Sequence, residues 1–194
     1  MQSCSRIFIC QQKYAMDMLK KFKMQDCKPV STPLTTSEKL SKDDDFEKID
    51  EGLYRNLIGS LLYLTTSRPD TLFAISVLSR FMHSPSEKHF SAAKRVLRYI
   101  KGTVAFGVQF SKFVEGDLKL LGYSNSDWGG CVDDSRSTLG YLFSLGSGFF
   151  HLELKETRNH NPIHNRGRIH CCCICCKSSF MVKKNTERLR ARAS

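Results

Sequence analysis

Apolar residues recur at helical spacing through the middle of the chain. Between residues 53 and 64 they return every three to four positions, which predicts one face of an amphipathic helix. A second series follows Pro69, a residue type that suits the first turn of a helix, and a third runs to Gly102, a residue type that ends helices. Three such helices with short links can bury one shared core. The periodic positions are, in chain order, Leu53, Leu57, Leu61 and Leu64; Leu72, Phe73, Val77, Leu78 and Phe81; and Phe90, Ala93, Leu97 and Ile100.

The third helix has a start signal of its own. Residues 84–87, Ser-Pro-Ser-Glu, have the spacing of a capping box with proline at the first helical position, which places the N-cap at Ser84. If the three helices pack together, one residue set should form their common core. We expect burial of Leu57, Leu61, Phe73, Val77, Leu97 and Ile100.

Two further elements are predicted before these helices. Residues 6–10 favour a short strand, and residues 12–22 favour a helix with Tyr14, Met18 and Phe22 on one face. Pro29 and Pro33 oppose regular helix in the stretch that follows, and residues 35–52 are mostly polar and charged. We therefore predict a linker over residues 35–52.

Alternating apolar residues predict two strands in the second half of the chain. Residues 120–123 lead into one strand, and Tyr141, Phe143 and Leu145 alternate along the other. Glycines and acidic residues between positions 129 and 135 supply the turn chemistry. Because most of the predicted helices and strands lie in separate stretches of the chain, the predicted class is α+β.

Positive charge is concentrated in the last part of the chain. The net charge of +11 indicates a polyanionic partner, and nucleic acid is the usual one. Residues 151–194 carry 10 Lys/Arg and 3 Asp/Glu, a net of +7, and hold five of the nine cysteines and four of the six histidines. The first 150 residues therefore carry only +4. We expect this tail to be poorly ordered, because its apolar residues follow no period and its charge is high.

The chain shows no sign of a targeting or membrane segment. No charged stretch followed by an apolar one opens it, and no apolar run approaches the length of a membrane span. Cys4, Cys10, Cys27 and Cys131 have no paired spacing, which suits a reducing compartment. The expected location is the cytoplasm or the nucleus, with no membrane partner.

Residues 121–148 read LGYSNSDWGGCVDDSRSTLGYLFSLGSG. They resemble the start of the RNase H domain in Pol polyproteins of copia-type LTR retrotransposons, whose pattern runs roughly Y-S-D-x-D-W-x-G, then D-D-x-x-S-T-S-G-Y. Asn125 stands where the family has its first Asp, and Leu139 stands where it has Ser. The matching residues are Tyr123, Ser124, Asp127, Trp128, Gly130, Asp133, Asp134, Ser137, Thr138, Gly140 and Tyr141.

Earlier strings resemble the same family. IFICQQKYAMDMLKKFKMQDCKPVSTPL, from residue 7, resembles the end of its reverse transcriptase domain. YRNLIGSLLYLTTSRPD and HFSAAKRVLRYIKGT, from residues 54 and 89, resemble the region that links polymerase to RNase H. The resemblance covers about residues 7–148. It implies a reverse transcriptase end over 1–34, a linker over 35–52, a helical connection over 53–103, an incomplete RNase H-like sheet over 104–150 and a disordered tail over 151–194.

The resemblance also implies a chemistry that this chain lacks. RNase H enzymes hold two Mg²⁺ ions with a cluster of carboxylates for phosphoryl displacement. The neutral amide of Asn125 is a poor replacement for the first carboxylate, and Asp127, Asp133 and Asp134 alone do not build a two-metal site. The adjacent Asp pair of the polymerase is expected upstream of the first residue, and the acidic triplet at 43–45 does not match it. We therefore expect a catalytically inactive fragment without a cofactor of its own, although the parent enzyme uses Mg²⁺.

A basic face is predicted on the third helix. Lys94, Arg98 and Lys101 lie at i, i+4 and i+7, with Arg95 beside them. One interpretation is a solvated helix face. The other is a phosphate-contacting stripe that follows the backbone of an RNA–DNA hybrid, or another nucleic acid, without reading bases. On that second interpretation the chain is a non-catalytic nucleic-acid-binding module derived from a transposon.

The cysteines of the tail suggest a metal site at first sight. Cys172 and Cys175 have C-x-x-C spacing, with His164 and His170 close in sequence, and zinc accepts such ligands. A structural zinc site also needs a second ligand pair some distance away, and none follows. A small zinc-binding protein is therefore the weaker alternative.

A shifted reading frame explains the tail better. Written with permitted codons and read one nucleotide later, residues 151–160 give Ile-Trp-Ser-Ser-Lys-Lys-Gln-Glu-Thr, and the copia family has W-S-S-K-K-Q at this point. Residues 164–170 in the same frame give Thr-Thr-Glu-Ala-Glu-Tyr, similar to the family's A-E-A-E-Y motif with its second catalytic carboxylate. One inserted T in the codons for Phe149 and Phe150 accounts for both strings.

Overall fold

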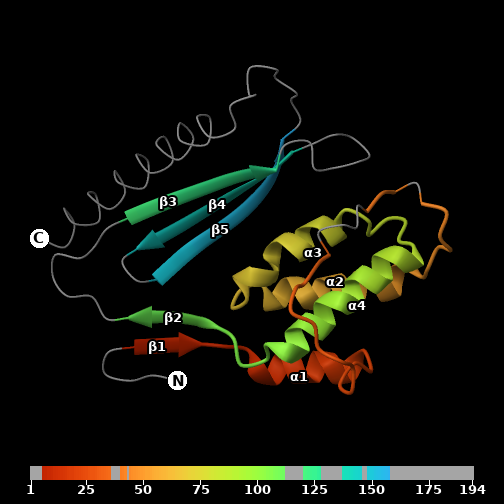
Figure 1. Ribbon diagram of the computed structural model, residues 1–194, viewed down its shortest axis with the longest axis horizontal. Coiled ribbons are helices and arrows are strands. Elements are labelled where there is room, and N and C mark those ends of the chain that lie inside the picture. The colour runs from red at the N-terminus through yellow and green to blue at the C-terminus, as the bar shows by residue number, and fades with distance from the viewer. Residues whose placement is uncertain are drawn as a thin grey trace, which may run out of the picture. The chain divides into compact units, whose positions relative to one another are not determined.

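The computed structural model describes residues 6–35, 40–42, 44–111, 120–127, 137–145 and 148–157 (Figure 1). The chain divides into two compact units: of the described residues, Phe8–Gln109 belong to the first, and Arg6, Ile7 and those from Phe110 onward belong to the second. Within the described residues every helix lies in the first unit, and the second consists of strands. The predicted α+β class is therefore confirmed.

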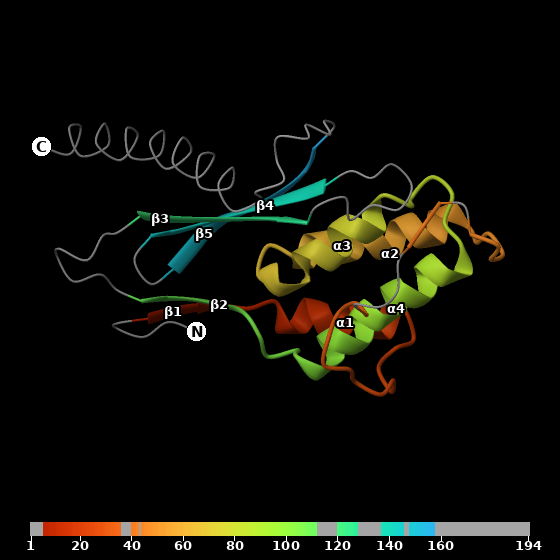
Figure 2. The same cartoon turned by 45° about the horizontal axis from the view of Figure 1, so that its top comes forward.

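Four α-helices form the first unit. They are α1 (Gln12–Lys21), α2 (Glu51–Leu64), α3 (Leu72–Ser79) and α4 (Glu87–Gly102), and the short 3-10 helix η1 (Pro69–Thr71) precedes α3. The helices predicted around residues 12–22, 53–64 and 90–102 are confirmed, and Pro69 opens the helical turn that leads into α3. Figures 1 and 2 show α4 running beside both α1 and α2.

The four helices bury one hydrophobic core. Leu57, Leu61, Leu97 and Ile100 lie in it as predicted, and Val77 packs against it. Helix α1 also contributes, so the core is larger than the three-helix core that the periodicity predicts. Its buried members are Ala15, Met18, Leu19, Tyr54, Leu57, Ile58, Leu61, Leu64, Ala74, Ile75, Leu78, Phe81, Ala92, Ala93, Val96, Leu97 and Ile100.

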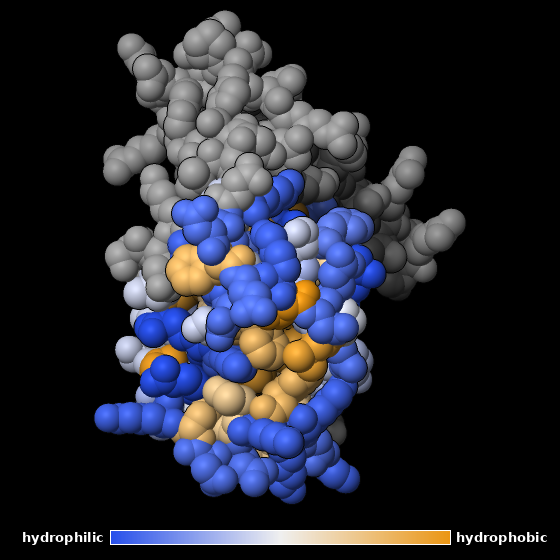
Figure 3. Space-filling model, turned by 90° about the vertical axis from the view of Figure 1, so that its right-hand side faces the viewer, coloured by the Kyte–Doolittle hydropathy of each residue, from blue (hydrophilic) through white to orange (hydrophobic). Residues whose placement is uncertain are grey.

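The predicted burial of Phe73 is wrong, because its side chain is 48% exposed. Helix α3 reads LFAISVLS and is apolar on nearly every side, so its sequence alone does not identify the inner face. Ala74, Ile75 and Leu78 take that face, which turns Phe73 outward. On the side of the molecule in Figure 3, apolar surface gathers in one area bordered by hydrophilic residues.

The start of α4 differs from the prediction by two residues. The N-cap is Ser86 rather than Ser84, and the capping box pairs Ser86 with His89 at the N3 position. Pro85 precedes the N-cap and is buried outside the helix, where its backbone oxygen accepts a hydrogen bond from Ile49 N–H at 3.0 Å. A histidine ring nitrogen thus takes the role that a Glu or Gln side chain usually plays in a capping box.

Strands β1 (Arg6–Ile9) and β2 (Val108–Ser111) form a two-stranded antiparallel sheet (Figure 1). The strand predicted over residues 6–10 is therefore confirmed. Gly107 precedes β2 at a point where the backbone of β1 comes very close. A Cβ atom there would lie 2.2 Å from the carbonyl oxygen of Ile9, so only glycine fits.

The second unit contains a three-stranded antiparallel sheet. Strands β3 (Leu120–Asp127), β4 (Ser137–Leu145) and β5 (Gly148–Thr157) lie in that order across the sheet. The predicted strand pair is confirmed as β3 and β4. Their register places Leu120 opposite Leu145 and Asp127 opposite Thr138.

The predicted disorder of residues 151–157 is wrong, since they form most of β5. The sequence has a period of two at this point. Leu152 and Leu154 alternate with His151, Glu153 and Lys155, a pattern that favours a half-buried strand. The rest of the predicted disordered tail, residues 158–194, lies outside the described residues, as does the proposed metal pair Cys172 and Cys175. None of the helices that the structure describes is both long enough and apolar enough to cross a membrane.

Candidate nucleic-acid interface

The four basic residues predicted as a stripe all lie on α4. Their charged groups are not all left to solvent, because three of them bind one neighbouring segment, residues 25–32. Arg95 donates from Nη2 to Thr32 Oγ1 at 3.0 Å, and Arg98 donates from Nε to the carbonyl oxygen of Lys28 at 2.8 Å. Lys101 donates from Nζ to the carbonyl oxygen of Gln25. Lys94 instead places its ammonium group over the ring of Phe90, 4.3 Å from the centroid.

These contacts hold the segment without neutralising the helix. Carbonyl and hydroxyl oxygens are neutral acceptors, so Arg95, Arg98 and Lys101 keep their full positive charge after binding them. The contacts also fix the direction of side chains that would otherwise move freely. A fixed cation loses less conformational entropy when it binds an anion.

A groove runs along the same side of α4 and contains Lys88, a cation outside the predicted stripe. It has a volume of about 750 Å³. Lys88 lines it together with Lys94, Arg95 and Arg98, whereas Glu87 is the one carboxylate among the lining residues that the structure describes. The spacing of Lys88 and Arg95, seven residues apart, would have indicated that they share a helix face.

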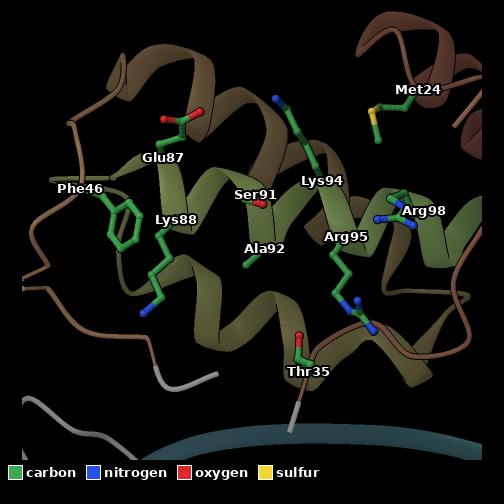
Figure 4. Close-up of a pocket in the computed structure, with 10 residues that line it drawn as sticks. All are labelled: Met24, Thr35, Phe46, Glu87, Lys88, Ser91, Ala92, Lys94, Arg95 and Arg98. Carbon is green, nitrogen blue, oxygen red and sulfur yellow. The ribbon is translucent and has the colours of Figure 1, made fainter. Parts of the chain in front are cut away.

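The lining side chains point in different directions from the helix (Figure 4). Lys88 and Arg95 extend to one side, where Thr35 lies, and Lys94 extends to the other. The ring of Phe46, which is 53% exposed, lies beside Lys88 at 5.8 Å from its ammonium nitrogen. The groove therefore combines several cations with an accessible aromatic ring, a combination suited to a phosphate backbone with exposed bases.

The predicted catalytic remnant lies in the second unit. Asn125 is in β3, with its backbone opposite Gly140 of β4, and Asp127 ends the strand opposite Thr138. Asp133 and Asp134 lie outside the described residues. The described part of the structure therefore places only the backbone of Asn125 and Asp127.

Their chemistry does not fit the metal pair that the family resemblance implies. Mg²⁺ prefers charged oxygen ligands, and the amide of Asn125 supplies none. Among the described residues, no group of three His, Cys, Asp or Glu side chains could hold a metal ion.

Two buried polar clusters in the helical unit were not predicted. In the first, Arg68 is 2% exposed, and its guanidinium group joins Asp70 in η1 to Thr103, the C-cap residue of α4. It donates to Asp70 from Nε at 3.0 Å and from Nη2 at 2.7 Å, and to the carbonyl oxygen and Oγ1 of Thr103 at 2.9 and 2.6 Å. The rings of Tyr99 and Phe106 lie 5.6 and 5.5 Å from its central carbon.

The second cluster contains Ser86, His89 and Asp44, the side chains of a hydrolase triad. Both Ser86 and His89 are fully buried, and the Ser86 hydroxyl group caps α4. A nucleophile must reach its substrate, and this hydroxyl group is closed off from solvent. The cluster is therefore structural in the described conformation.

Comparison with known proteins identifies the origin of the chain. No family model and no solved structure matches it. The chain is 41% identical over 140 residues to "Retrovirus-related Pol polyprotein from transposon RE2" of Arabidopsis thaliana, an alignment that covers 72% of this chain and 10% of that protein. It is 36% identical over 150 residues to "Retrovirus-related Pol polyprotein from transposon TNT 1-94" of Nicotiana tabacum, covering 74% of this chain and 11% of that protein.

The chain is also similar to a much shorter protein. "Secreted RxLR effector protein 161" of Plasmopara viticola is 42% identical over 106 residues, covering 54% of this chain and 73% of that protein. The chain spans about a tenth of the length of the Pol polyproteins that it matches. The chain belongs to the family of retrovirus-related Pol polyproteins from copia-type transposons.

Proposed function

We propose that this chain is the part of a copia-type Pol polyprotein that joins the reverse transcriptase to RNase H, and that it has no catalytic activity of its own. The family strings of residues 7–34, 54–70 and 121–148 support this assignment in that order along the chain. The antiparallel pair of β3 and β4 fits the predicted first strands of the RNase H-like sheet. The observation that carries the proposal of inactivity is Asn125, a neutral residue where the family pattern has its first Asp.

We expect the purified chain to leave the RNA strand of an RNA–DNA hybrid intact with either Mg²⁺ or Mn²⁺. Asn125→Asp alone should also be inactive, because the second catalytic carboxylate is encoded out of frame on our interpretation of the tail. The measurement is gel analysis of a labelled 20-base-pair hybrid over several hours, with an active RNase H enzyme as the positive control. Metal-dependent cleavage by the unmodified chain, abolished by Asp127→Ala, would overturn this proposal.

A second proposed role concerns the groove on α4. We propose that Lys88, Lys94, Arg95 and Arg98 contact the phosphates of a nucleic acid, without reading its sequence. Among the described residues four cations and one carboxylate line the groove, a balance that favours a polyanionic partner. Side chains already fixed against residues 25–32 would hold the charges in place for the backbone.

The salt dependence of binding separates this role from general attraction to a basic protein. Lys88→Gln combined with Lys94→Gln removes two groove cations and leaves the three side chains that hold residues 25–32. We expect the slope of log K against log salt concentration to become shallower by about 2, roughly one per lost phosphate contact. Fluorescence anisotropy with a labelled RNA–DNA hybrid measures it.

The matched control is Lys13→Gln with Lys20→Gln, which removes the same charge from exposed positions on α1. The basic tail is present in both double variants, so it contributes equally. The control should leave the slope nearly unchanged. Equal effects of the two double variants would mean that only net charge matters, and the proposed groove interface would be wrong.

A further inference from the structure

Residues 44–49 lie across the beginning of α4 and are attached to it by two backbone hydrogen bonds, which make one β-bridge. Lys48 and Ser86 form an antiparallel β-bridge. Ile49 N–H donates to the carbonyl oxygen of Pro85 at 3.0 Å, and Glu87 N–H donates to the carbonyl oxygen of Glu47 at 2.9 Å. We call residues 44–49 the strap.

A buried cluster lies beneath the strap. Ser86 N–H donates to Nδ1 of His89 at 3.0 Å, so Nδ1 is an acceptor and the ring proton of the neutral imidazole is on Nε2. The Ser86 hydroxyl group donates to Asp44 Oδ2 at 2.5 Å, which joins the strap to the N-cap. The His89 ring stacks on Phe81 at 3.9 Å between centroids, and its Nε2 lies 3.8 Å from Asp44 Oδ2.

We propose that the strap is a pH-sensitive element, which is held on α4 while His89 is neutral and is released when His89 takes up a proton. A proton on Nδ1 would remove the acceptor that binds Ser86 N–H and so break the capping box. It would also place a full charge on a ring that is wholly buried against Phe81. Release of the strap exposes the ring to water and relieves both effects.

The charged groups around His89 agree with this direction. Burial lowers the pKa of His89 below its ordinary value of 6.5, and it outweighs the opposing effects of the Asp44 charge and the backbone of Ser41. Lys48 on the strap and Lys88 on α4 lower the pKa of His89 further. Phe81, which follows α3, contributes only its uncharged ring.

Asp44 does not titrate in the same range. Burial raises the pKa of Asp44, but the Ser86 hydrogen bond and the charges of His89 and Lys48 outweigh it and hold this pKa below 3.8. The carboxylate therefore stays charged between pH 5 and 8. Because the pKa of His89 is lower with the strap closed than with it open, closure is most stable above pH 6.5 and weakens as the pH falls below that value.

The strap also forms part of the groove wall. It carries Phe46, whose ring lies beside Lys88. Release would therefore move an aromatic ring away from the groove cations. The pH response itself does not depend on the nucleic-acid role proposed above.

Hydrogen exchange at two amide groups tests the strap directly. Ile49 N–H and Glu87 N–H make the hydrogen bonds between the strap and α4, so their protection factors report its opening. The experiment uses the full chain, and the measured rates are corrected for intrinsic exchange. We expect the protection factors of both amides to fall about tenfold between pH 7.5 and pH 5.5. This is the change expected when opening is coupled to uptake of one proton by a histidine with an ordinary pKa of 6.5 in the open state. Amides within α2 should keep their protection over this range.

Two variants identify the responsible group. His89→Gln replaces the ring with the usual capping-box residue, so it preserves the cap and removes the titration. It should abolish the pH dependence at both amides. His83→Gln changes an exposed histidine and should leave the pH dependence intact.

A wild-type chain with unchanged protection at pH 5.5, or a His89→Gln variant with the wild-type pH response, would overturn the proposal. If His89→Gln does not fold, an NMR titration of the wild-type His89 ring decides instead. The ring must then titrate below pH 6.5, together with the loss of protection at Ile49 and Glu87. Titration of the ring without that loss would also contradict it.

Discussion

Replacing Arg68 with methionine should lower the free energy of unfolding by about 3 kcal/mol, one of the two largest effects that we expect in this chain. Methionine keeps the apolar stem but removes all four hydrogen bonds of the guanidinium group. The hydroxyl oxygen of Thr103 loses its donor, its carbonyl oxygen keeps only the hydrogen bond from Phe106 N–H, and Asp70 loses its ion-pair partner. Breaking a buried ion pair from one side costs about 3–5 kcal/mol, and the lower figure applies because the Asp70 side chain is 33% exposed.

Arg55→Met is the matched control in the same unit. Arg55 also forms an ion pair with a carboxylate, Glu51, at 2.7 Å, but both side chains are about half exposed. Its loss should cost about 1 kcal/mol at most, since water already solvates both groups. Urea denaturation of both variants measures the difference. Equal losses would show that burial of the Arg68 cluster contributes no stability.

The pH dependence of the Arg68 effect gives a second check. Burial raises the pKa of Asp70, but hydrogen bonds from Arg68 and Tyr99 and the charge of Arg68 outweigh it and hold this pKa below 3.8. The stability that the charged Asp70 carboxylate contributes is present above pH 3.8. It is lost as the pH falls through the pKa that Asp70 has in the folded state, which is lower than 3.8. The difference between wild type and Arg68→Met should therefore shrink at acidic pH, and an undiminished difference would mean that packing of the guanidinium group dominates.

The sequence predicts where helices occur better than which side of each helix is buried. Periodicity alone locates α1, α2 and α4, because their polar and apolar faces are distinct. On α3 nearly every residue is apolar, so the same rule misplaces Phe73. The cap of α4 is misplaced for a different reason. Two serines flank Pro85, and the choice of Ser86 depends on a hydrogen bond from its backbone to His89, which the usual pattern with Glu or Gln does not contain.

The roles of polar residues are harder to predict, because their partners are distant in sequence. The spacing of Lys94, Arg98 and Lys101 correctly places them on one helix, but the contacts of Arg98 and Lys101 lie 70 and 76 residues away. The same holds for Arg68, which binds Thr103 across 35 residues. No local pattern contains such information. The unpredicted clusters are therefore those that depend on tertiary packing.

Leu61→Ala should cost about 2–5 kcal/mol of unfolding free energy, comparable with or larger than the loss at Arg68. Leu61 is fully buried in the core that α2 shares with the other helices. Truncation removes three carbon atoms from contact and leaves a cavity that a close-packed core fills only in part. The intrinsic helix propensities of leucine and alanine differ little, so helix formation itself contributes almost nothing to the loss.

The neighbouring residue provides the control. Leu62 follows on the same helix but is 39% exposed, so Leu62→Ala makes the same chemical change with much less burial at stake. We expect a loss of about 1 kcal/mol or less for it, since only part of its apolar area is removed from water. The two variants are compared by urea denaturation of the full chain, followed by circular dichroism at 222 nm, a wavelength that reports helices. If Leu61→Ala costs less than about 0.5 kcal/mol, the four helices do not pack as one core in solution, and the groove and the strap that depend on α4 would lose their common support.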